Sequence, residues 1–448
     1  MRVIVVGAGK LGYEIAKLLA AEGHDIVVID QNEDALTEVT NNLDVMAIHG
    51  NGASPKVLER AGVDHTDVLM AVAGPDEVNI IACLAAKRRR VPVCAARVRH
   101  EDYLAGDDPS FTQQQLGIDV VVNPERAAAL EIARLLKTPT ATQVDYFASG
   151  RVSLVRLRVE QDAPITRGPL REIRPQRCVV AAVVRDDAIM IPDGETTIQA
   201  GDKIYLSGQT GAFPEIRSLV GSPARRLREI TIVGGGRVGF PLAQILTRGQ
   251  RRGVEIKLIE KDPDRCSQLA ADLPGVLIIC GDGAKPEVLR EELVERSDAL
   301  VAVSGEDATN LLATIAAKQL GVPQAIVELS REDYVPLAER AGADASVVPR
   351  LITASTLLKL ARRDEVVSLS LLEEGRAAAV ELVVEEGAPA EGMRLEELRM
   401  PKGAVVGAVV RYDEVIVPKG ATEIHADDHL VLFGTVDALD RARDLFRT

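Results

Sequence analysis

Residues 1–12 read MRVIVVGAGKLG, and residues 228–239 read REITIVGGGRVG. In each stretch, a short run of β-branched apolar residues leads into a GxGxxG pattern and then into a helix-forming segment. In such a pattern the first glycine allows a tight turn, the second lets the backbone approach a diphosphate, and the third lets helix and strand pack closely. The sequence therefore predicts two strand–turn–helix units, each with a phosphate-binding turn.

An acidic residue ends the strand that follows each pattern. Asp30 ends DIVVID and Glu260 ends EIKLIE. An acid at this place accepts hydrogen bonds from ribose hydroxyls and repels a 2′-phosphate, so NAD or an adenine nucleotide is favoured over NADP. The alternative is a Rossmann-like scaffold that has lost its ligand, and the residues alone leave it open for both halves.

The chain also repeats itself at long range. Residues 50–58 read GNGASPKVL and residues 281–289 read GDGAKPEVL, an offset of 231 residues. The same offset relates Asp76 to Asp307 and, three positions later, Asn79 to Asn310. A period this long is typical of duplicated whole domains rather than of a solenoid.

Each half divides into a larger and a smaller segment. In the larger one, continuous apolar strands alternate with helices, which predicts a parallel sheet covered on both faces. The smaller one shows alternating strands around turns marked by Pro and Gly. The predicted fold class is α/β, with tandem Rossmann-like doubly wound parallel sheets, each followed by a small α+β domain. The expected domains are 1–137, 144–218, 228–362 and 366–448, with a linker over 217–229 between the halves.

Composition excludes several classes of protein. The chain has 448 residues, and its 53 Lys and Arg against 67 Asp and Glu give a net charge of 53 − 67 = −14. An acidic chain is a poor candidate for coating nucleic acid, which requires a positive surface. The sequence has no apolar run long enough to span a bilayer, no signal-peptide pattern and no CxxC pair among its 5 cysteines. We therefore expect a cytoplasmic protein whose cysteines are reduced, and we predict no metal site.

Two further pairs of loops are expected at the carboxyl edges of the sheets, where open α/β sheets bind ligands. The third strand of each half leads into Gly-Asn-Gly or Gly-Asp-Gly, whose polar side chain is a candidate contact for adenine or ribose; an ordinary Asx turn is the alternative. The fourth strand leads into Ala-Gly or Ser-Gly, expected on the other side of the ligand. These candidates are Asn51 and Asp282 after the third strands, and Ala73, Gly74, Ser304 and Gly305 after the fourth.

Together these features resemble the TrkA family of Trk potassium-uptake regulators, which are built from two regulator-of-potassium-conductance (RCK, or KTN) units. The resemblance rests on GAGKLG with VID, on GNGASPKVL, on ARVRHEDY and on the second VGGGRVG with LIE. It implies NAD(H) binding, with ATP or ADP as further candidates. It also implies a homotetrameric ring of eight units that lies on the cytoplasmic face of the membrane under a membrane-embedded TrkH-type potassium pore.

The resemblance also implies a set of nucleotide contacts. Arg97 would add a cation near the phosphates of the first half, whereas Glu328 takes its place in the second. A carboxylate beside phosphates costs Coulomb energy, which leaves the ligand and affinity of the second site open and favours different nucleotides at the two sites. The implied contacts are Gly7, Ala8, Gly9, Lys10, Leu11, Gly12, Asp30, Asn51, Ala73, Gly74 and Arg97 in the first half, and Gly234, Gly235, Gly236, Arg237, Val238, Gly239, Glu260, Asp282, Ser304 and Gly305 in the second.

The sequence favours a switch over an enzyme. Beyond its nucleotide domain each half has only a short segment, without a His, Lys or Tyr constellation that could be placed near a hydride. Sensing needs only a difference in nucleotide affinity between two conformations. We therefore expect a regulatory subunit of a potassium uptake system. The alternatives are an NAD-dependent oxidoreductase of unusual duplicated layout and a scaffold with empty clefts.

Overall fold

The structure is a computed structural model that describes residues 1–21, 23–100, 103, 115–137, 141–173, 175–186, 188–221, 227–248, 253–361, 368–372, 376–412 and 414–448. Several sequence expectations fall partly outside these residues. They are residues 222–226 of the expected linker, residues 101–102 of the ARVRHEDY segment, and residues 138–140 and 362–367 at the expected domain boundaries.

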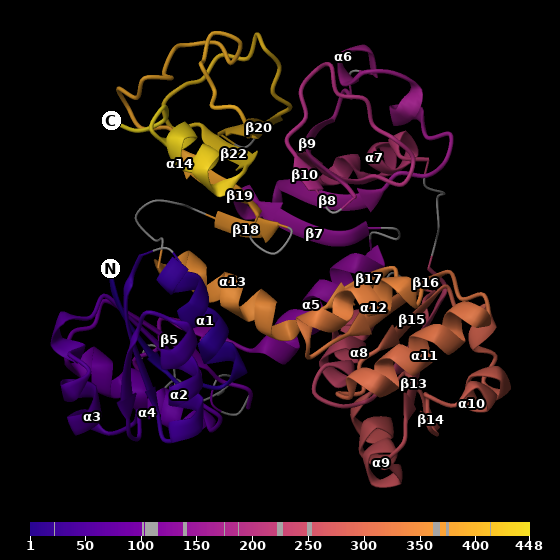
Figure 1. Cartoon of the computed structure of the whole chain (residues 1–448). Coiled ribbons are helices and arrows are strands. Elements are labelled where there is room, and N and C mark those ends of the chain that lie inside the picture. Colours follow the sequence, from indigo (N-terminus) through magenta and orange to yellow (C-terminus); the bar gives the residue numbers. More distant parts are fainter. Residues whose placement is uncertain are drawn as a thin grey trace. The chain divides into compact units, whose positions relative to one another are not determined.

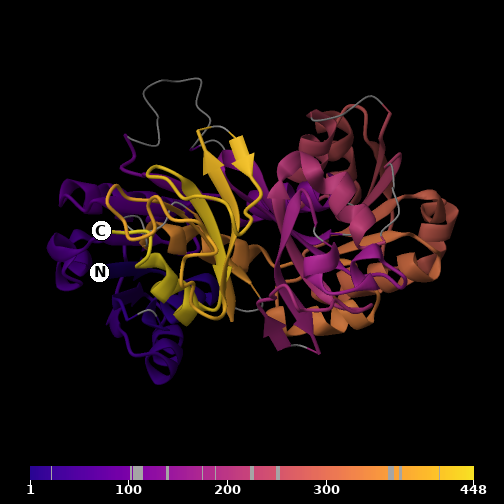
Figure 2. The same ribbon diagram turned by 90° about the horizontal axis from the view of Figure 1, so that it is seen from above.

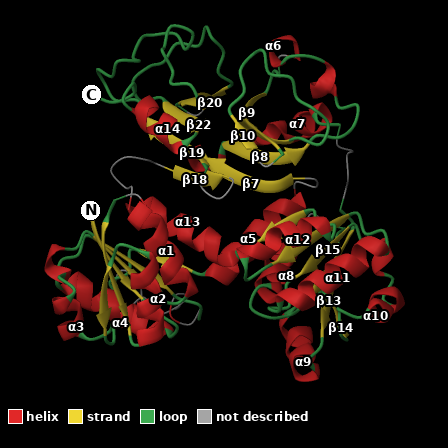
Figure 3. Ribbon diagram, viewed as in Figure 1, coloured by secondary structure: helices red, strands yellow, loops and turns green. Residues whose placement is uncertain are grey.

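The first half opens with a parallel sheet of six strands in the order β3-β2-β1-β4-β5-β6. This is the strand order of a Rossmann fold, in which the chain switches direction between β1 and β4. The strands are continuous apolar runs because both faces of the sheet are covered by helices (Figure 3). The elements are β1 (Arg2–Val6), α1 (Lys10–Ala21), β2 (Asp25–Asp30), α2 (Glu33–Asn42), β3 (Met46–His49), α3 (Pro55–Arg60), β4 (Val68–Ala71), α4 (Asp76–Arg88), β5 (Val93–Arg97), β6 (Val120–Val122) and α5 (Pro124–Lys137).

The second half repeats this sheet as β14-β13-β12-β15-β16-β17. The predicted pair of doubly wound parallel sheets is thereby confirmed. The elements are β12 (Glu229–Val233), α8 (Gly239–Arg248), β13 (Glu255–Glu260), α9 (Pro263–Asp272), β14 (Leu277–Cys280), α10 (Pro286–Glu291), β15 (Ala299–Ala302), α11 (Asp307–Gln319), β16 (Gln324–Glu328), α12 (Val335–Arg340), β17 (Ala345–Val347) and α13 (Pro349–Ala361).

The compact units of the chain do not coincide with its two halves. One unit combines residues 1–129 with residues 348–363, so α13 of the second half packs against α1 of the first (Figure 1). The other unit contains residues 130–347 and 364–448, so the later part of α5 belongs with the second parallel sheet. There, the buried Gln324 Nε2 donates to the Leu135 carbonyl at 3.5 Å. Helix α13 therefore belongs to the unit of the first parallel sheet, and the later part of α5 belongs to the unit of the second.

Each smaller segment forms an antiparallel sheet of five strands, with the orders β10-β9-β11-β8-β7 and β18-β19-β22-β20-β21. Figure 2 shows the long strands of the second of these sheets (yellow) side by side. Short helices accompany both sheets, which agrees with the predicted α+β class. The elements are β7 (Ala141–Phe147), β8 (Val152–Arg158), α6 (Leu170–Ile173), β9 (Cys178–Arg185), β10 (Ala188–Met190), β11 (Lys203–Gln209), α7 (Phe213–Leu219), β18 (Ser368–Leu372), β19 (Ala377–Val383), β20 (Ala404–Arg411), β21 (Glu414–Ile416), β22 (His429–Gly434) and α14 (Val436–Arg443).

The two antiparallel sheets share one apolar core. Phe147 and Phe433 meet edge to face with their ring centroids 6.3 Å apart, and both rings are fully buried. At the border of this core, the buried Glu381 accepts a hydrogen bond from the Ala148 amide at 2.9 Å. The smaller segments thus pair with each other. Among the described helices, none has the combination of length and apolar character needed to cross a membrane.

Candidate nucleotide site

The first glycine loop joins β1 to α1 at the switch point of the first sheet. Gly7 has φ = 109°, and a Cβ there would lie 2.7 Å from the Ala73 amide nitrogen. A Cβ on Gly12 would lie 1.8 Å from the Gly7 carbonyl oxygen. The chain itself therefore requires glycine at both positions, because the glycine loop lies against the residues after β4 at Gly7, and α1 lies against the loop at Gly12, too closely for any side chain.

Gly9 has no such explanation within the chain. A Cβ at this residue would meet no described atom within 4 Å, and its φ is not left-handed. Its carbonyl accepts from the Tyr13 amide at 2.9 Å, so it caps α1, where the free amides of a helix start point outward. Lys10 and Leu11 follow, the first exposed and the second buried against the sheet. The space over Gly9 is thus open at the place where a diphosphate is expected.

The acid at the end of β2 is fixed against this loop. Asp30 Oδ2 accepts from the Ala8 amide at 2.5 Å, and Oδ1 accepts from the Asn32 amide at 2.9 Å. Each carboxylate oxygen keeps a second lone pair, so the group can still accept from ribose hydroxyls. The structure therefore places the loop and the predicted ribose acid together.

The loop after β3 lies at the same edge of the sheet. Asn51 Oδ1 accepts from the Ala53 amide at 2.9 Å, which is the Asx turn weighed as the alternative reading of this residue. A Cβ on Gly52 would lie 2.1 Å from Val6 Cγ1, so the loop packs directly on the end of β1. Asn51 is exposed beside the loop, and the turn uses only one of its hydrogen-bonding groups.

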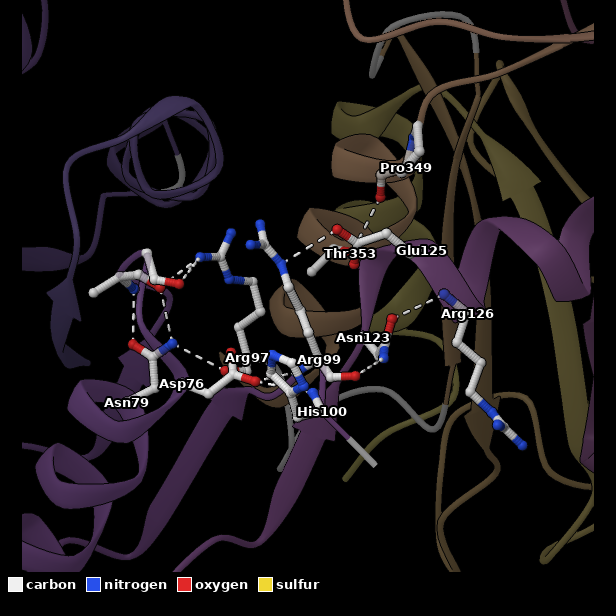
Figure 4. A network of polar contacts seen from close by, with 12 residues as sticks. Asp76, Asn79, Arg97, Arg99, His100, Asn123, Glu125, Arg126, Pro349 and Thr353 are labelled. Atoms are coloured by element: carbon white, nitrogen blue, oxygen red, sulfur yellow. Dashed lines mark hydrogen bonds and ion pairs between the residues drawn. The ribbon is translucent and has the colours of Figure 1, made fainter. Parts of the chain in front are cut away.

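The loop after β4 is held by a buried network (Figure 4). Arg97 is only 8% exposed, and its Nη2 donates to the carbonyls of Ala73 at 2.5 Å and Gly74 at 3.1 Å. Asn79 bonds both the amide and the carbonyl of Ala73, at 2.8 and 2.9 Å, and donates to the Arg97 carbonyl at 2.9 Å. The predicted contacts Ala73, Gly74 and Arg97 are therefore brought together, with the guanidinium bound to the loop.

Two residues of this network, Asp76 and Asn79, were not among the predicted site residues. Asp76 is buried, and its Oδ2 accepts from the amides of Arg99 at 2.7 Å and His100 at 3.0 Å. Arg99 in turn pairs with Glu125 at 3.2 Å, at the start of α5. The available signal was their repetition at one offset, because a polar pair retained in both halves indicates a shared structural task.

Replacing Asn79 by Ala is expected to destabilise the protein by about 2 kcal/mol or more. The change leaves the Ala73 amide and the Arg97 carbonyl without this partner in a buried setting. Thermal unfolding measures the effect. Asn310→Ala is the matched variant, since Asn310 bonds the Ser304 amide at 2.8 Å and the Glu328 carbonyl at 3.0 Å in the same way. A melting temperature unchanged in both variants would contradict the structural role of the network.

The second half builds an equivalent site. A Cβ on Gly239 would lie 1.8 Å from the Gly234 carbonyl oxygen, and one on Gly236 would meet no described atom within 4 Å. Glu260 Oε2 accepts from the Gly235 amide at 2.8 Å, as Asp30 does from Ala8. The remaining predicted residues lie as follows: Arg237 is exposed, Val238 is buried, Asp282 forms an Asx turn with the Ala284 amide at 3.1 Å, Ser304 is bound by Asn310, and Gly305 has φ = 83°.

The two sites differ in their charged side chains. Glu328 ends β16 where Arg97 ends β5. The loop after β15 in the second half therefore has no guanidinium from that position. A cation enters instead from α9, where Arg265 Nε donates to the Gly235 carbonyl at 3.1 Å. Arg265 therefore adds a positive charge on the side of the ribose acid in the second site, whereas Arg97 adds one on the side of β4 in the first.

Comparison with known proteins gives consistent matches over the whole chain. The model of the TrkA-N domain matches residues 3–124 and 230–349, and that of the TrkA-C domain matches residues 154–221 and 379–447. The Trk system potassium uptake protein TrkA homolog of Archaeoglobus fulgidus is 36% identical, and the match covers 100% of both chains.

Among solved structures, the GsuK RCK domain has a TM-score of 0.61 at 20% identity and covers 99% of this chain and 94% of its own. The GsuK channel bound to NAD has a TM-score of 0.62 at 19% identity, with 99% and 78% covered. At these identities the likeness concerns the fold, which is that of tandem RCK units. With two TrkA-N and two TrkA-C domains and a full-length relative at this identity, the chain belongs to the TrkA family of Trk-system potassium uptake proteins.

Proposed function

We propose that this chain is a cytoplasmic nucleotide-sensing regulatory subunit of a potassium uptake system. The observation that carries the proposal is the open space over Gly9, at a helix start whose other two glycines are required by the chain itself. A glycine without a structural reason at that position is explained by a ligand whose phosphates approach the backbone. The potassium system is inferred from the name of the A. fulgidus relative.

The proposed nucleotide is NAD(H), with ATP or ADP as the further candidates. Asp30 faces the loop as a ribose acceptor and would repel a 2′-phosphate, which favours NAD over NADP. The fold neighbour solved with NAD supports the same choice. Arg97 contributes a nearby cation in the first half, so we assign the tighter site to the first loop. The site residues proposed here are those that the sequence predicted.

Regulation, rather than turnover, is the proposed use of this site. Nucleotide binding biases the chain between two conformations of a homotetrameric ring of eight RCK units, and the ring acts on a membrane-embedded TrkH-type potassium pore. Driving such a gate from mostly closed to mostly open requires about 5.5 kcal/mol of differential binding. Several sites in one ring share that requirement.

Ligand-dependent melting of paired variants tests the site. Gly9→Trp fills the open space over the first loop, and Gly236→Trp does the same in the second. For the wild-type protein we expect NAD at 100 times its Kd to add about 2.7 kcal/mol of stability. Gly9→Trp should keep the ligand-free melting temperature but lose most of the stabilisation by NAD. Gly236→Trp should lose only the smaller share of that stabilisation, which comes from the second site.

The same samples separate the alternatives. A dehydrogenase predicts continuous NADH formation with some small substrate, whereas the regulator predicts saturable binding without turnover. An empty scaffold predicts no stabilisation by NAD, NADH, ATP or ADP. Stabilisation that survives in the Gly9→Trp/Gly236→Trp double variant would place the nucleotide elsewhere and overturn the site assignment.

A further inference from the structure

A pair of cysteine thiols lies beside the second glycine loop. Cys266 is in the first turns of α9, and Cys280 is the last residue of β14. Their Sγ atoms are 2.9 Å apart. Cys266 is buried and Cys280 is exposed. The pair therefore consists of one exposed and one buried cysteine.

Both cysteines lie next to the backbone of Glu260, the predicted ribose acid of the second half. Cys266 Sγ donates to the Glu260 carbonyl at 3.3 Å. Cys280 lies beside Glu260 in the register of β13 and β14, and the next amide, that of Gly281, donates to the same carbonyl at 2.8 Å. Oxidation of the pair would therefore change the surroundings of the Glu260 backbone first.

The first half shows that the scaffold does not require these cysteines. The fourth residue of α2 is Leu36, where α9 has Cys266, and the last residue of β3 is His49, where β14 has Cys280. Leu36 is buried and fills the position of a core side chain without any thiol chemistry. The pair is thus a feature of the second site alone.

We propose that Cys266 and Cys280 form a reversible dithiol–disulfide site, and that oxidation weakens nucleotide binding at the second glycine loop. The effect on binding rests on the function proposed above, whereas the disulfide chemistry does not. In a reducing compartment, an adjacent thiol pair with one exposed member is suited to transient, sensing oxidation.

The oxidant is a low-molecular-weight disulfide of the glutathione class. The exposed Cys280 thiol first attacks it, forming a mixed disulfide and releasing one small thiol. Cys266 then attacks Cys280 Sγ, gives up its proton and releases the second small thiol. Two protein thiols lose two electrons, and one small disulfide becomes two thiols. Burial, followed by the hydrogen bond with Cys280, raises the pKa of Cys266 to about 12, so the exposed Cys280 is the thiol that reacts first.

Oxidation has a direct route to the loop. A disulfide brings the sulfur atoms to about 2.05 Å, which draws the first turn of α9 toward the end of β14. It also removes the thiol proton that Cys266 donates to the Glu260 carbonyl. Arg265, the residue before Cys266, donates to the Gly235 carbonyl at 3.1 Å, so a shift of this turn reaches the glycine loop.

The chain contains its own control pair. Cys83 in α4 and Cys94 in β5 are also neighbours, but both are fully buried. Cys178 is buried as well. An oxidant in solution should therefore reach Cys280 and leave these three thiols reduced in the folded protein.

The test is mass analysis of the full-length protein after incubation with glutathione disulfide. The wild-type protein should lose two hydrogens and two of its five free thiols, and peptide mapping should join Cys266 to Cys280. Cys266→Ser should instead hold one glutathionyl group on Cys280, because the resolving thiol is missing. Cys280→Ser should remain unmodified. Five free thiols in the treated wild-type protein, or a Cys83–Cys94 disulfide in its place, would overturn the site.

Nucleotide binding is then measured in the Gly9→Trp background, which isolates the second loop. Oxidation should weaken NAD binding about fivefold or more, and a thiol reductant should restore it. The Gly9→Trp/Cys280→Ser protein should show no change with oxidant. An unchanged affinity in the oxidised protein would refute the coupling. If the reduced second loop binds no NAD, ATP or ADP, the second-site part of the proposed function fails together with the coupling, while mass analysis still decides whether the disulfide forms.

Discussion

Gly12→Ala is expected to lower the stability of the protein by about 3 kcal/mol or more, whereas Gly9→Ala changes it by no more than about 1 kcal/mol. A Cβ at residue 12 would overlap the Gly7 carbonyl oxygen. The Cβ is fixed to the backbone of α1 and the carbonyl belongs to the backbone of the loop, so neither can move without separating α1 from β1. At residue 9 the same Cβ enters open space, and the only cost is the weaker capping by Ala at the start of α1. The same substitution should therefore cost much stability at Gly12 and little at Gly9, although the two residues are only three positions apart.

Thermal unfolding and NAD binding measured on the same two variants separate folding from function. At about 2–4 °C for each kcal/mol, Gly12→Ala should melt roughly 6–12 °C lower than the wild-type protein. Gly9→Ala should melt close to the wild type but bind NAD more weakly, since in the proposed site its methyl group would lie where the phosphates approach. Gly239→Ala and Gly236→Ala repeat the comparison in the second half. If Gly9→Ala binds NAD as well as the wild type, the reason given for that glycine is wrong.

The part of the fold that could be predicted is the part governed by local patterns. RVIVV and DIVVID are continuous apolar strands, and Gly23, just beyond α1, has φ = 77° as expected of a helix-ending glycine. The glycine pattern predicted the contact between β1, its loop and α1. These features depend on residues close in sequence, so a single chain reveals them.

Features that depend on distant contacts were not predictable. Strand β7 has buried residues at every third position, Ala141, Val144 and Phe147, which is not the alternation of a typical strand. Helix α13 is predominantly apolar, and nothing in its pattern indicates that it packs on α1 of the other half. The buried hydrogen bonds of Asn79 to the last residue of β5 and of Asp76 to the residues after β5 likewise join residues 18–24 positions apart. In the sequence, only the repetition of Asp76 and Asn79 as Asp307 and Asn310 indicated that these residues have a structural role.

A second repeated feature is an ion pair between an arginine and a buried aspartate in each antiparallel sheet, called the clasp below. Asp202, 3% exposed, accepts from Arg185 Nε at 2.8 Å and Nη2 at 2.7 Å, and its Oδ2 also accepts from the Gln199 amide at 2.8 Å. Arg411 and Asp428 repeat the arrangement, with both Nε and Nη2 at 2.8 Å. Each clasp ties the loop before the last long strand to the strand that carries the arginine.

Arg185→Leu is expected to destabilise the protein by about 3 kcal/mol, because it leaves the Asp202 carboxylate buried with a single amide partner. This loss is at the low end for a broken buried ion pair. The Arg185 side chain is 27% exposed, so water can take over part of its interaction with Asp202 in the variant. Arg185→Leu/Asp202→Leu should recover most of the loss, because it removes the buried charge with its partner. Thermal unfolding at pH 7 measures both. Equal losses in the single and double variants would contradict a charge-based cost.

The pH dependence gives the sharper test of this clasp. Burial alone would raise the pKa of Asp202, but the hydrogen bonds and charge of Arg185, together with the Gln199 amide, outweigh burial and lower it. A lowered pKa means that the stabilisation is complete above the unfolded value of about 3.9 and is lost as pH falls through the still lower folded value. In Arg185→Leu, burial is opposed only by the amide, so the folded pKa of Asp202 should rise and protonation near pH 4 should relieve the strain of the buried charge. The difference in melting temperature between wild type and Arg185→Leu should therefore shrink as pH falls from 7 toward 4, and a constant difference would show that Arg185 acts through packing alone.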